Sequence, residues 1–481
     1  MNKRMTLYLI ATMLGAEGML MLIPALVSIF YQERIATSFL VMSLILITIF
    51  LLGRDLPKNT TIYGKEGLVV VGAAWILWSF FGAWPYILSG YIPDFLNAFF
   101  ESTSGFTTTG SSILTDVEIL PKGLALWRVL TNWIGGMGVL VFVLMLTSME
   151  NDNTMHLMRA EVPGPEANKL VPRAKNTAKL LYSIYLILTG AMTLLLMVGG
   201  LSFFDAIVHA FSTAGTGGFS NRTDSISHFN SAYIDGIVSI FMVLFGINFN
   251  LYFLIRLKKW RAALKNEELL TYLGIIVAST AIITLNVLNF YNGSVARAFR
   301  YASFQVTSII STTGLCTANY NLWPELSKNI LLILMVIGSC AGSTGGGIKV
   351  SRFLIVLKGI RQEIRRMLHP KAVTLVRVNG KKVAKDTVNN VYIYCICYVF
   401  VMIISIVIIS LDNFDFATTF TAVFTTISNV GPGLGAVGPA DSFAVFSPLS
   451  KIILCMDMLF GRLEIFPYLL MLSPDLWRTK F

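Results

Sequence analysis

The chain has 481 residues, of which 55% are hydrophobic and 13% are charged, and its mean hydropathy is +0.70. A soluble domain carries about 25% charged residues. The composition therefore excludes a soluble globular protein and indicates an all-α membrane protein with many spans. The lipid bilayer is its expected surrounding, and no nucleic-acid partner is expected for its net charge of +11.

Long apolar runs predict ten membrane spans. They lie at 6–30, 37–52, 68–88, 124–146, 177–198, 232–255, 269–288, 329–357, 391–409 and 445–472. The first run ends without a small-residue cleavage site, which indicates a retained span and not a signal peptide. Lys and Arg crowd the joints after the second, fourth, sixth and eighth spans. By the positive-inside rule, these joints and both termini are expected to be cytoplasmic.

A short apolar run rich in Phe, Ser and Thr, ending in a glycine loop, occurs four times. The four glycines are Gly110, Gly218, Gly314 and Gly431. Each run is too short to cross a bilayer, which takes about 20 residues, yet each lies between two segments that are long enough. Open backbone at membrane depth is tolerated only where it is buried or lines a water-filled cavity. The repetition predicts helix, half-helix with loop, helix, four times around one pore.

This pattern divides the chain into two extra N-terminal membrane helices, 1–60, and four repeats. The repeats are expected at 61–165, 166–262, 263–375 and 376–481. An aspartate near the start of three half-helices, Asp94, Asp205 and Asp415, suits an N-cap. The third half-helix has Arg297 instead and is expected to be an exception to the capping pattern.

The four loops contain the chemistry that a dehydrated cation needs. Glycine allows unusual backbone angles, so that carbonyl oxygens can replace the hydration shell. The partially negative C-terminal end of a half-helix favours a cation near the loop. The loop cores contain no acidic residue, and Ca²⁺ and Mg²⁺ prefer carboxylates and retained water. The loops therefore predict a carbonyl filter for a large monovalent ion.

Two further features lie in the predicted spans. Residues 338–347 include five glycines, which destabilise a helix interior by about 1 kcal/mol each, so the eighth span is expected to unwind there. Close helix packing through small residues is the alternative. Arg462 lies inside the tenth span, where a charge is costly and usually functional. The alternative to a functional role is that Arg462 forms a structural ion pair with Glu464 or Asp457.

Several residue types predict no chemistry of their own. The five cysteines lack zinc-site spacing and are expected to be small apolar core residues. His209 has no second ligand nearby and is expected to pack or to form a hydrogen bond. The glycine-rich stretch before Lys349 lacks the Gly-Lys-Ser/Thr ending of a P-loop, and no His-Glu-x-x-His occurs. We therefore expect no enzyme. Asn248 and Asn250 are weaker polar candidates near the inner half of the pore.

Longer motifs make the chain recognisable. They are Phe-Thr-Thr-Thr-Gly110-Ser, Gly-Thr-Gly-Gly218-Phe-Ser-Asn, Ser-Thr-Thr-Gly314-Leu, Ser-Asn-Val-Gly431-Pro-Gly-Leu-Gly and Gly-Ser-Cys-Ala-Gly-Ser-Thr-Gly-Gly-Gly-Ile-Lys349. Over nearly its whole length the chain resembles the Trk/Ktr/HKT superfamily of potassium transporters, and within it the bacterial Trk-type membrane subunit.

The resemblance implies roles for particular residues. The four glycines are then the filter glycines, and the neighbouring carbonyl donors are Thr109, Gly217, Thr313 and Val430. In the family, serine in place of the first glycine goes with sodium transport, so Gly110 favours K⁺. An intramembrane loop containing Gly345, Gly346, Gly347 and Lys349, together with Arg462, is expected to gate the pore below the filter.

The resemblance also implies partners. The family forms homodimers with one pore in each subunit, and it binds a cytosolic ring of nucleotide-binding regulatory subunits. ATP/ADP or NAD(H) would then act through that partner, and this chain would need no cofactor besides the transported K⁺. Arg352–Lys385 is the candidate contact, and a solvated, lipid-facing basic rim is its alternative.

The leading hypothesis is gated, channel-like potassium uptake across a bacterial inner (plasma) membrane. The competing hypothesis is a secondary active transporter that couples K⁺ or a small solute to H⁺ or Na⁺. Such transporters usually place two broken segments in an inverted repeat, whereas four half-helices in one orientation are expected here. A non-transporting scaffold would leave the four glycines unexplained.

Overall fold

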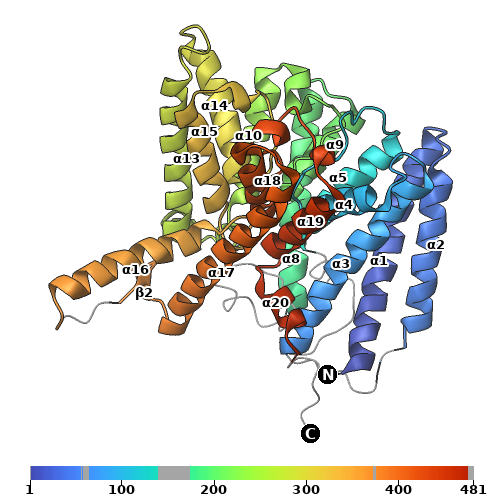
Figure 1. The fold of residues 1–481 in the computed structure, drawn as a ribbon, viewed down its shortest axis with the longest axis horizontal. Coiled ribbons are helices and arrows are strands. Elements are labelled where there is room, and N and C mark those ends of the chain that lie inside the picture. Colours follow the sequence, from blue (N-terminus) through green and yellow to red (C-terminus); the bar gives the residue numbers. More distant parts are fainter. Residues whose placement is uncertain (1, 56, 58–63, 139–173, 372–374, 475–481) are drawn as a thin grey trace.

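The computed structural model describes residues 2–55, 57, 64–138, 174–371 and 375–474. These residues form a bundle of helices, and the only strands among them are β1 (Arg377–Val378) and β2 (Lys381–Lys382), paired antiparallel. The start of α1 and the end of α20 lie at the same end of the bundle (Figure 1). The predicted all-α class is confirmed.

The first two helices, α1 (Lys3–Phe30) and α2 (Ala36–Gly53), form a hairpin beside the first repeat. Gly18 allows the two helices to approach closely, because an added Cβ there would lie 2.9 Å from Leu46 Cβ. Ser43 donates a hydrogen bond to the Gly18 carbonyl at 2.7 Å. Trp78 of α3 donates to the Met13 carbonyl at 3.1 Å, which holds the hairpin against the repeat.

Each repeat has a continuous first helix and a half-helix. The first helices are α3 (Gly64–Leu88), α8 (Ala174–Val198), α13 (Glu267–Asn286) and α17 (Lys385–Ile409). The half-helices are α4 (Phe95–Phe106), α9 (Phe203–Gly215), α14 (Val295–Ile310) and α18 (Phe416–Ser428). Short helices in the connections are η2 (Ser225–Phe229), α12 (Trp260–Leu264), η3 (Tyr320–Leu322), η4 (Ser410–Asp412), η5 (Gly435–Val437) and η6 (Phe443–Val445).

The second helix of every repeat is interrupted or short. These segments are α5 (Lys122–Met137), α10 (Ala232–Gly246) with α11 (Phe249–Arg256), α15 (Glu325–Ile337) with α16 (Val350–Leu368), and α19 (Pro448–Arg462) with α20 (Phe466–Leu472). The sixth and tenth predicted spans are therefore wrong as single helices, whereas the break in the eighth span was expected. The helices α10 and α11 meet at 88°. Residues 139–146 of the fourth predicted span lie outside the described residues.

Glycine explains where these helices end. α5 stops before Gly138 and α15 before Gly338, whose φ angles are +81° and +67°. α10 ends on Gly246. Positive φ costs glycine little and terminates a helix readily. Among the described residues, six continuous helices are long and apolar enough to span a membrane, and the bent pair α10–α11 would make a seventh.

All four half-helices have an N-cap, and two capping predictions are corrected, because Asp205 is not the cap of α9 and the third half-helix is capped. Asp94 and Asp415 cap α4 and α18 as expected. Ser202 caps α9, with Asp205 one turn later. The cap of α14 is Ser294, which accepts a bond from the Arg297 amide, so the third half-helix is no exception. The prediction considered only the charged residue and overlooked the hydroxyl before it.

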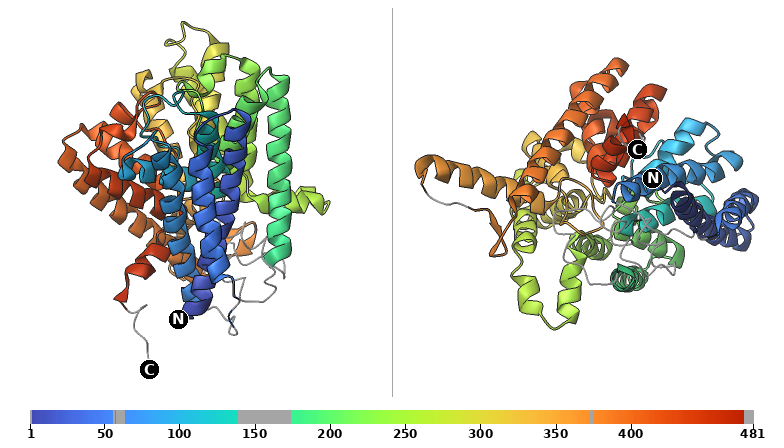
Figure 2. Two further views of the ribbon diagram at one scale, coloured as in Figure 1. Left: turned by 90° about the vertical axis from the view of Figure 1, so that its right-hand side faces the viewer. Right: turned by 90° about the horizontal axis from the view of Figure 1, so that it is seen from below.

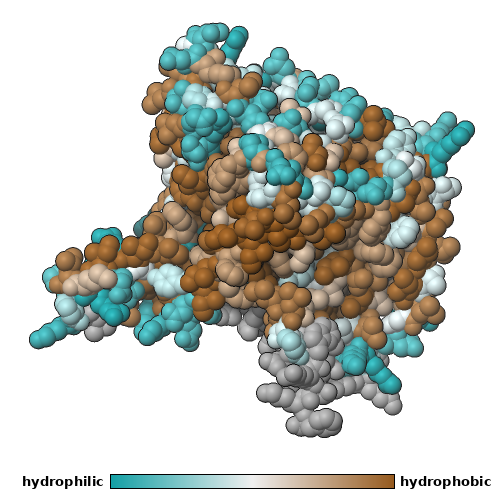
Figure 3. Space-filling model, in the orientation of Figure 1, coloured by the Kyte–Doolittle hydropathy of each residue, from teal (hydrophilic) through white to brown (hydrophobic). Residues whose placement is uncertain are grey.

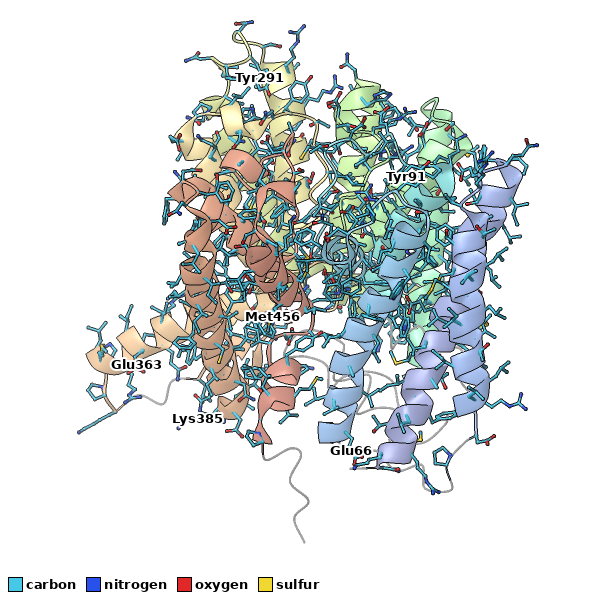
Figure 4. The ribbon with its side chains drawn as sticks, turned by 45° about the vertical axis from the view of Figure 1, so that its right-hand side comes forward. Glu66, Tyr91, Tyr291, Glu363, Lys385 and Met456 are labelled. Carbon is cyan, nitrogen blue, oxygen red and sulfur yellow. The ribbon has the colours of Figure 1, made fainter. Side chains whose placement is uncertain are left out.

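The repeats follow one another around a central axis (Figure 2). Each second helix contacts the half-helix of the next repeat: α5 meets α9, α10 meets α14, α15 meets α18, and α19 returns to α4. Figure 4 places Tyr91 and Tyr291, just before α4 and α14, at one end, and Glu66 and Lys385 at the other. The visible face has apolar residues across its middle and polar residues near both ends (Figure 3).

The Ser294 cap yields a stability prediction. Ser294→Ala should destabilise the protein by about 1 kcal/mol, because the first turn of α14 loses its side-chain acceptor. Thermal unfolding of the purified protein in detergent measures the change. Ser183→Ala is the control, since that exposed hydroxyl only returns to the Lys179 carbonyl within α8. Equal melting temperatures for the two variants would contradict the capping role.

Candidate functional site

The four glycine loops meet in a closed ring, here named the glycine ring: Thr109–Gly110, Gly217–Gly218, Thr313–Gly314 and Val430–Gly431. An ideal Cβ on Gly110 would lie 2.0 Å from the Gly217 oxygen, one on Gly218 2.2 Å from the Thr313 oxygen, one on Gly314 2.0 Å from the Val430 oxygen, and one on Gly431 2.8 Å from the Thr109 oxygen. Each glycine thus packs against the carbonyl that precedes the glycine of the next repeat. All eight residues predicted for the filter are brought together.

The backbone of the four loops follows one design. The residue two before each glycine has a left-handed conformation: Thr108, Thr216, Thr312 and Asn429, with φ from +53° to +58°. The next amide turns back to its own half-helix: Thr109 to Ser104 O, Gly217 to Ser212 O, Thr313 to Ser308 O and Val430 to Thr425 O, at 2.8 to 3.0 Å. The amide donors of these ring residues are therefore used by the half-helices.

The carbonyl oxygens of the same residues remain available. Among the hydrogen bonds of the described residues, none ends on the carbonyl oxygen of Thr109, Gly217, Thr313 or Val430. Buried carbonyl groups are normally paired. Four unpaired carbonyls at one ring, each just beyond the C-terminus of a half-helix, form a site suited to a cation.

Side-chain ligand sets of the usual metal-binding kind are not found in the part of the chain that the structure describes. Within those ranges, no group of three or more His, Cys, Asp or Glu side chains could hold a metal ion. The ring offers backbone oxygens together with the hydroxyls of Thr109 and Thr313, which bond to Thr107 (2.8 Å) and Ser311 (2.7 Å). A hard divalent ion would favour carboxylates over this set.

An open hollow lies on one side of the ring and is lined by all four glycines. Phe219, Cys316, Pro432 and Asp441 form part of its wall. Because the half-helices begin at the end marked by Tyr91 and Tyr291 (Figure 4) and their loops turn back toward it, the hollow opens at that end.

On the opposite side, residues 338–349, here named the inner loop, lie against the ring. Gly346 donates its amide to the Thr312 hydroxyl at 2.6 Å. An ideal Cβ on Gly345 would lie 2.7 Å from the Ser311 oxygen, and one on Gly346 2.4 Å from the Ser428 oxygen. A residue with a side chain cannot enter this space unless its neighbours move. The predicted unwinding of the eighth span is confirmed.

Arg462 holds the inner loop from the fourth repeat, and Lys349 forms a bond within the loop. Arg462 donates to the Thr344 carbonyl at 2.7 Å and to the carbonyls of Gly135 and Gly136 at the end of α5. The buried Lys349 ammonium donates to the Gly345 carbonyl. Arg462 therefore connects the first repeat, the inner loop and the fourth repeat directly beneath the ring.

The carboxylates proposed as ion-pair partners of Arg462 contact other groups. Asp457 accepts from Ser405 at 2.8 Å. Glu464 pairs with Arg352 of α16 at 2.5 Å, and the Arg352 guanidinium lies 4.1 Å from the centre of the Tyr394 ring. Ile465 follows with φ of +62°, a strained angle for a β-branched residue. The Arg352–Glu464 pair thus links α16 to the chain just after Arg462.

The remaining polar candidates have smaller roles in this geometry. Asn248 caps α11 by accepting the Asn250 amide at 2.9 Å, and its side chain lies beside Gly342 of the inner loop. Within the described residues, the Asn250 side chain makes no contact that assigns it a role. His209 bonds to the Asp205 carbonyl and the Ser220 hydroxyl, as expected for a hydrogen-bonding group. All five cysteines are free, and three are buried.

Of the residues that hold each loop beyond its glycine, the sequence pointed only to His209, as a hydrogen-bonding group without an assigned partner. Glu101, His209 and Gln305 each lie nine positions before the ring glycine of their repeat, and Thr421 ten positions before it. Each bonds to its own loop beyond the glycine, at Ile113, Ser220, Thr317 and Leu434 respectively, the bond to Thr317 forming with the Gln305 amide oriented so that its oxygen accepts. Alignment on the glycines places the first three polar residues at one position, which the differing residue types conceal, whereas the fourth repeat has Ala422 there and its polar residue one position earlier.

The fold and the site together define a polytopic helical membrane protein. Its four loops meet in one ring of backbone carbonyl oxygens, whose geometry suits a cation. The family model described as "TrkH: Cation transport protein" matches residues 35–478, and the chain belongs to this family. The Trk system potassium uptake protein TrkH of Salmonella typhimurium is 36% identical over 95% of this chain and 96% of its own length. TrkG of Escherichia coli is 32% identical, with 95% of each chain covered.

A solved structure agrees with the fold. The crystal structure of the potassium transporter TrkH from Vibrio parahaemolyticus has a TM-score of 0.90 and is 31% identical to this chain. The match covers 99% of this chain and 100% of that one. The superfamily named from the sequence motifs is therefore confirmed.

The close contacts of the ring yield a prediction at Gly218. Gly218→Ala should reduce cation flux into liposomes at least about tenfold, because a positive φ disfavours alanine by about 1–3 kcal/mol and the new Cβ would meet the Thr313 oxygen. Gly236→Ala in α10 is the control, since nothing lies within 4 Å of its added Cβ. Equal flux through both variants would show that the ring tolerates a side chain.

Proposed function

We propose that this protein is the pore-forming subunit of a potassium uptake system in a bacterial inner membrane, and that K⁺ crosses through the glycine ring. The observation that carries the proposal is the set of four unpaired carbonyls, one from each repeat, among the described residues. Carbonyl oxygens in a closed ring can replace the water lost by a dehydrated ion. The potassium uptake named for the curated relatives supports the same ion.

Selectivity for K⁺ over Na⁺ would depend on the first loop. An ideal Cβ on Gly110 would lie only 2.0 Å from the facing carbonyl oxygen, and of the four ring glycines only Gly314 has an equally close approach. A serine at position 110 would need to displace the Gly217 carbonyl, which is one of the four proposed ligands. Glycine at position 110 leaves the Gly217 carbonyl in place. In the superfamily that the chain resembles, glycine at this position goes with K⁺ transport.

The inner loop would close the path below the ring. Arg462 places a positive charge there, which repels a cation that has passed the ring. Movement of the inner loop and Arg462 away from the axis would open the path, so that K⁺ flows down its electrochemical gradient. In this proposal the contacts of Gly345, Gly346 and Gly347 represent the closed state.

A cytosolic nucleotide-binding partner and a second copy of the chain complete the proposal. α16 projects sideways from the bundle at the end that carries Lys385 (Figures 1 and 4). Arg361, Arg365 and Arg366 lie along it toward the solvent, which supports Arg352–Lys385 as a contact for an acidic partner surface. Because α16 begins directly after the inner loop, a partner that moved it would act on the proposed gate. Charge reversal at the three arginines tests this contact. It should abolish binding of the cytosolic nucleotide-binding partner.

The alternative is a secondary active transporter that couples K⁺ or a small solute to H⁺ or Na⁺. The helix, half-helix, helix pattern recurs four times, and the loops of all four half-helices meet in one ring, whereas such transporters usually have an inverted pair of broken helices. This arrangement supports the channel-like hypothesis. The flux experiment below distinguishes the two.

Monovalent-cation flux into liposomes that contain the purified protein tests ring and gate together. Gly110→Ser should lower the K⁺/Na⁺ flux ratio about tenfold, the equivalent of about 1.4 kcal/mol. Deletion of Gly345–Gly347 should raise K⁺ and Rb⁺ flux, because the inner loop no longer reaches the ring. Coupled uptake of another solute without independent K⁺ flux would overturn the proposal and favour the secondary transporter.

The link between α16 and Arg462 gives a separate prediction. Glu464→Gln removes the ion pair with Arg352, so Arg462 should leave the inner loop more often and K⁺ flux without the partner should rise several-fold. Glu363→Gln is the control, because that exposed carboxylate pairs only weakly with Arg366 at 3.5 Å. Unchanged flux in both variants would remove Glu464 from the gating mechanism.

A further inference from the structure

A buried ion pair lies behind the first two loops of the glycine ring. Arg128 of α5 donates from Nε to Glu101 Oε1 of α4 at 2.8 Å, and its Nη2 lies 2.7 Å from the same oxygen. The two side chains are 2% and 0% exposed. Such a pair often stabilises a protein no better than apolar residues of the same size. Its place beside the ring therefore points to a role other than stability.

Glu101 holds the outer side of the first loop. Its carboxylate accepts from the Ser112 hydroxyl at 3.0 and 3.1 Å and from the Ile113 amide at 3.0 Å. These residues follow Gly110 by two and three positions. One rigid group on α4 therefore fixes the backbone that leaves the first ring glycine.

Arg128 reaches the second loop. Its Nη1 donates to the Ser220 carbonyl at 3.0 Å, two positions after Gly218. Its guanidinium also lies 4.1 Å from the centre of the Phe219 ring, where a cation–π contact is favourable. The planar guanidinium offers donors in fixed directions, which a lysine does not. The ion pair is thus a bridge from one loop of the ring to the next.

The equivalent positions of the other repeats hold their loops with uncharged groups. His209 bonds to Ser220 at 3.0 Å, and Thr421 accepts the Leu434 amide at 2.9 Å. Gln305, with its amide oriented to accept, bonds to the Thr317 amide at 3.0 Å. Of these four equivalent positions, only the first has a carboxylate, and its arginine partner extends to the second loop. The contact between loops one and two is therefore fixed by strong, directional bonds.

We infer that Glu101 and Arg128 are positioning residues for cation selection, which set the distance between the first and second loops. This inference rests on the proposed function and deepens it. The loops they fix supply Thr109, Gly110, Gly217 and Gly218, which make the 2.0 Å approach between Gly110 and Gly217 described above. Arg128 also lines the outer hollow, and Glu101 cancels its charge, so that incoming cations are not repelled.

Arg128→Lys tests the inference. Lysine retains the charge beside Glu101 but loses the fork that reaches Ser220. The K⁺/Na⁺ flux ratio in liposomes should fall at least about tenfold, since small misplacements of binding groups have large effects. The yield and melting temperature should remain close to wild type. Arg222→Lys is the matched control: that arginine lines the same hollow but is 30% exposed and forms looser ion pairs.

A second pair of variants separates a loss of selectivity from a loss of folding. Glu101→Gln leaves a buried arginine unpaired and should reduce the yield, whereas the double variant Glu101→Gln/Arg128→Gln should recover the yield without recovering the flux ratio. Recovery of both would overturn the inference and leave the pair a structural role. A wild-type ratio in Arg128→Lys would also overturn it. A wild-type protein without preference for K⁺ would overturn the proposed function, and this inference with it.

Discussion

The whole arrangement depends on the absence of side chains at four points. Each ring glycine touches the carbonyl of the following repeat at a distance that leaves no room for a Cβ. The contacts run from the first repeat to the second, third and fourth, and then back to the first. Because each loop is supported by the next, the four loops form one unit, and the position of any carbonyl depends on all four repeats.

The same constraint explains why the second helices stop. α5 ends where Gly135 faces the Phe106 carbonyl at the C-terminus of α4, and α19 ends where Gly461 faces the Ile427 carbonyl at the C-terminus of α18. A half-helix must end near the centre of the bundle to present its loop, so its neighbour must approach closely there. Glycine permits that approach and weakens the helix at the same point. The interruptions of the second helices and the glycine ring therefore have the same structural cause.

The parts of the fold that follow from local chemistry could be predicted from the sequence. Apolar length placed the continuous helices, and the four glycines with their preceding residues are visible in the sequence alone. The breaks in α10–α11 and α19–α20 were not predicted, because the apolar residues on both sides were interpreted as one span although Gly246 with Asn248 and Arg462 with Glu464 stand at the breaks. Ser294 was overlooked because aspartate alone was sought as a cap.

Glu101 and Arg128 were missed for a different reason. They lie 27 positions apart in the chain, and their partners belong to two different loops, so no short motif contains them. Hydropathy treats Arg128 as an ordinary charge near the start of α5. Only the fold shows that a neighbouring half-helix brings a carboxylate to it and that the same guanidinium reaches the second repeat.

One polypeptide supplies all four quarters of the ring, and this has a genetic consequence. In an assembly of four identical subunits, a single codon change alters every quarter at once, and an unfavourable change is multiplied fourfold. Here a mutation at Gly110, Gly218, Gly314 or Gly431 replaces the residue of one quarter only, and it reaches another quarter through the neighbouring carbonyl that its new Cβ would meet. Evolution can therefore adjust one wall of the ring separately from the others. The residues before the four glycines have already diverged to threonine, glycine, threonine and valine.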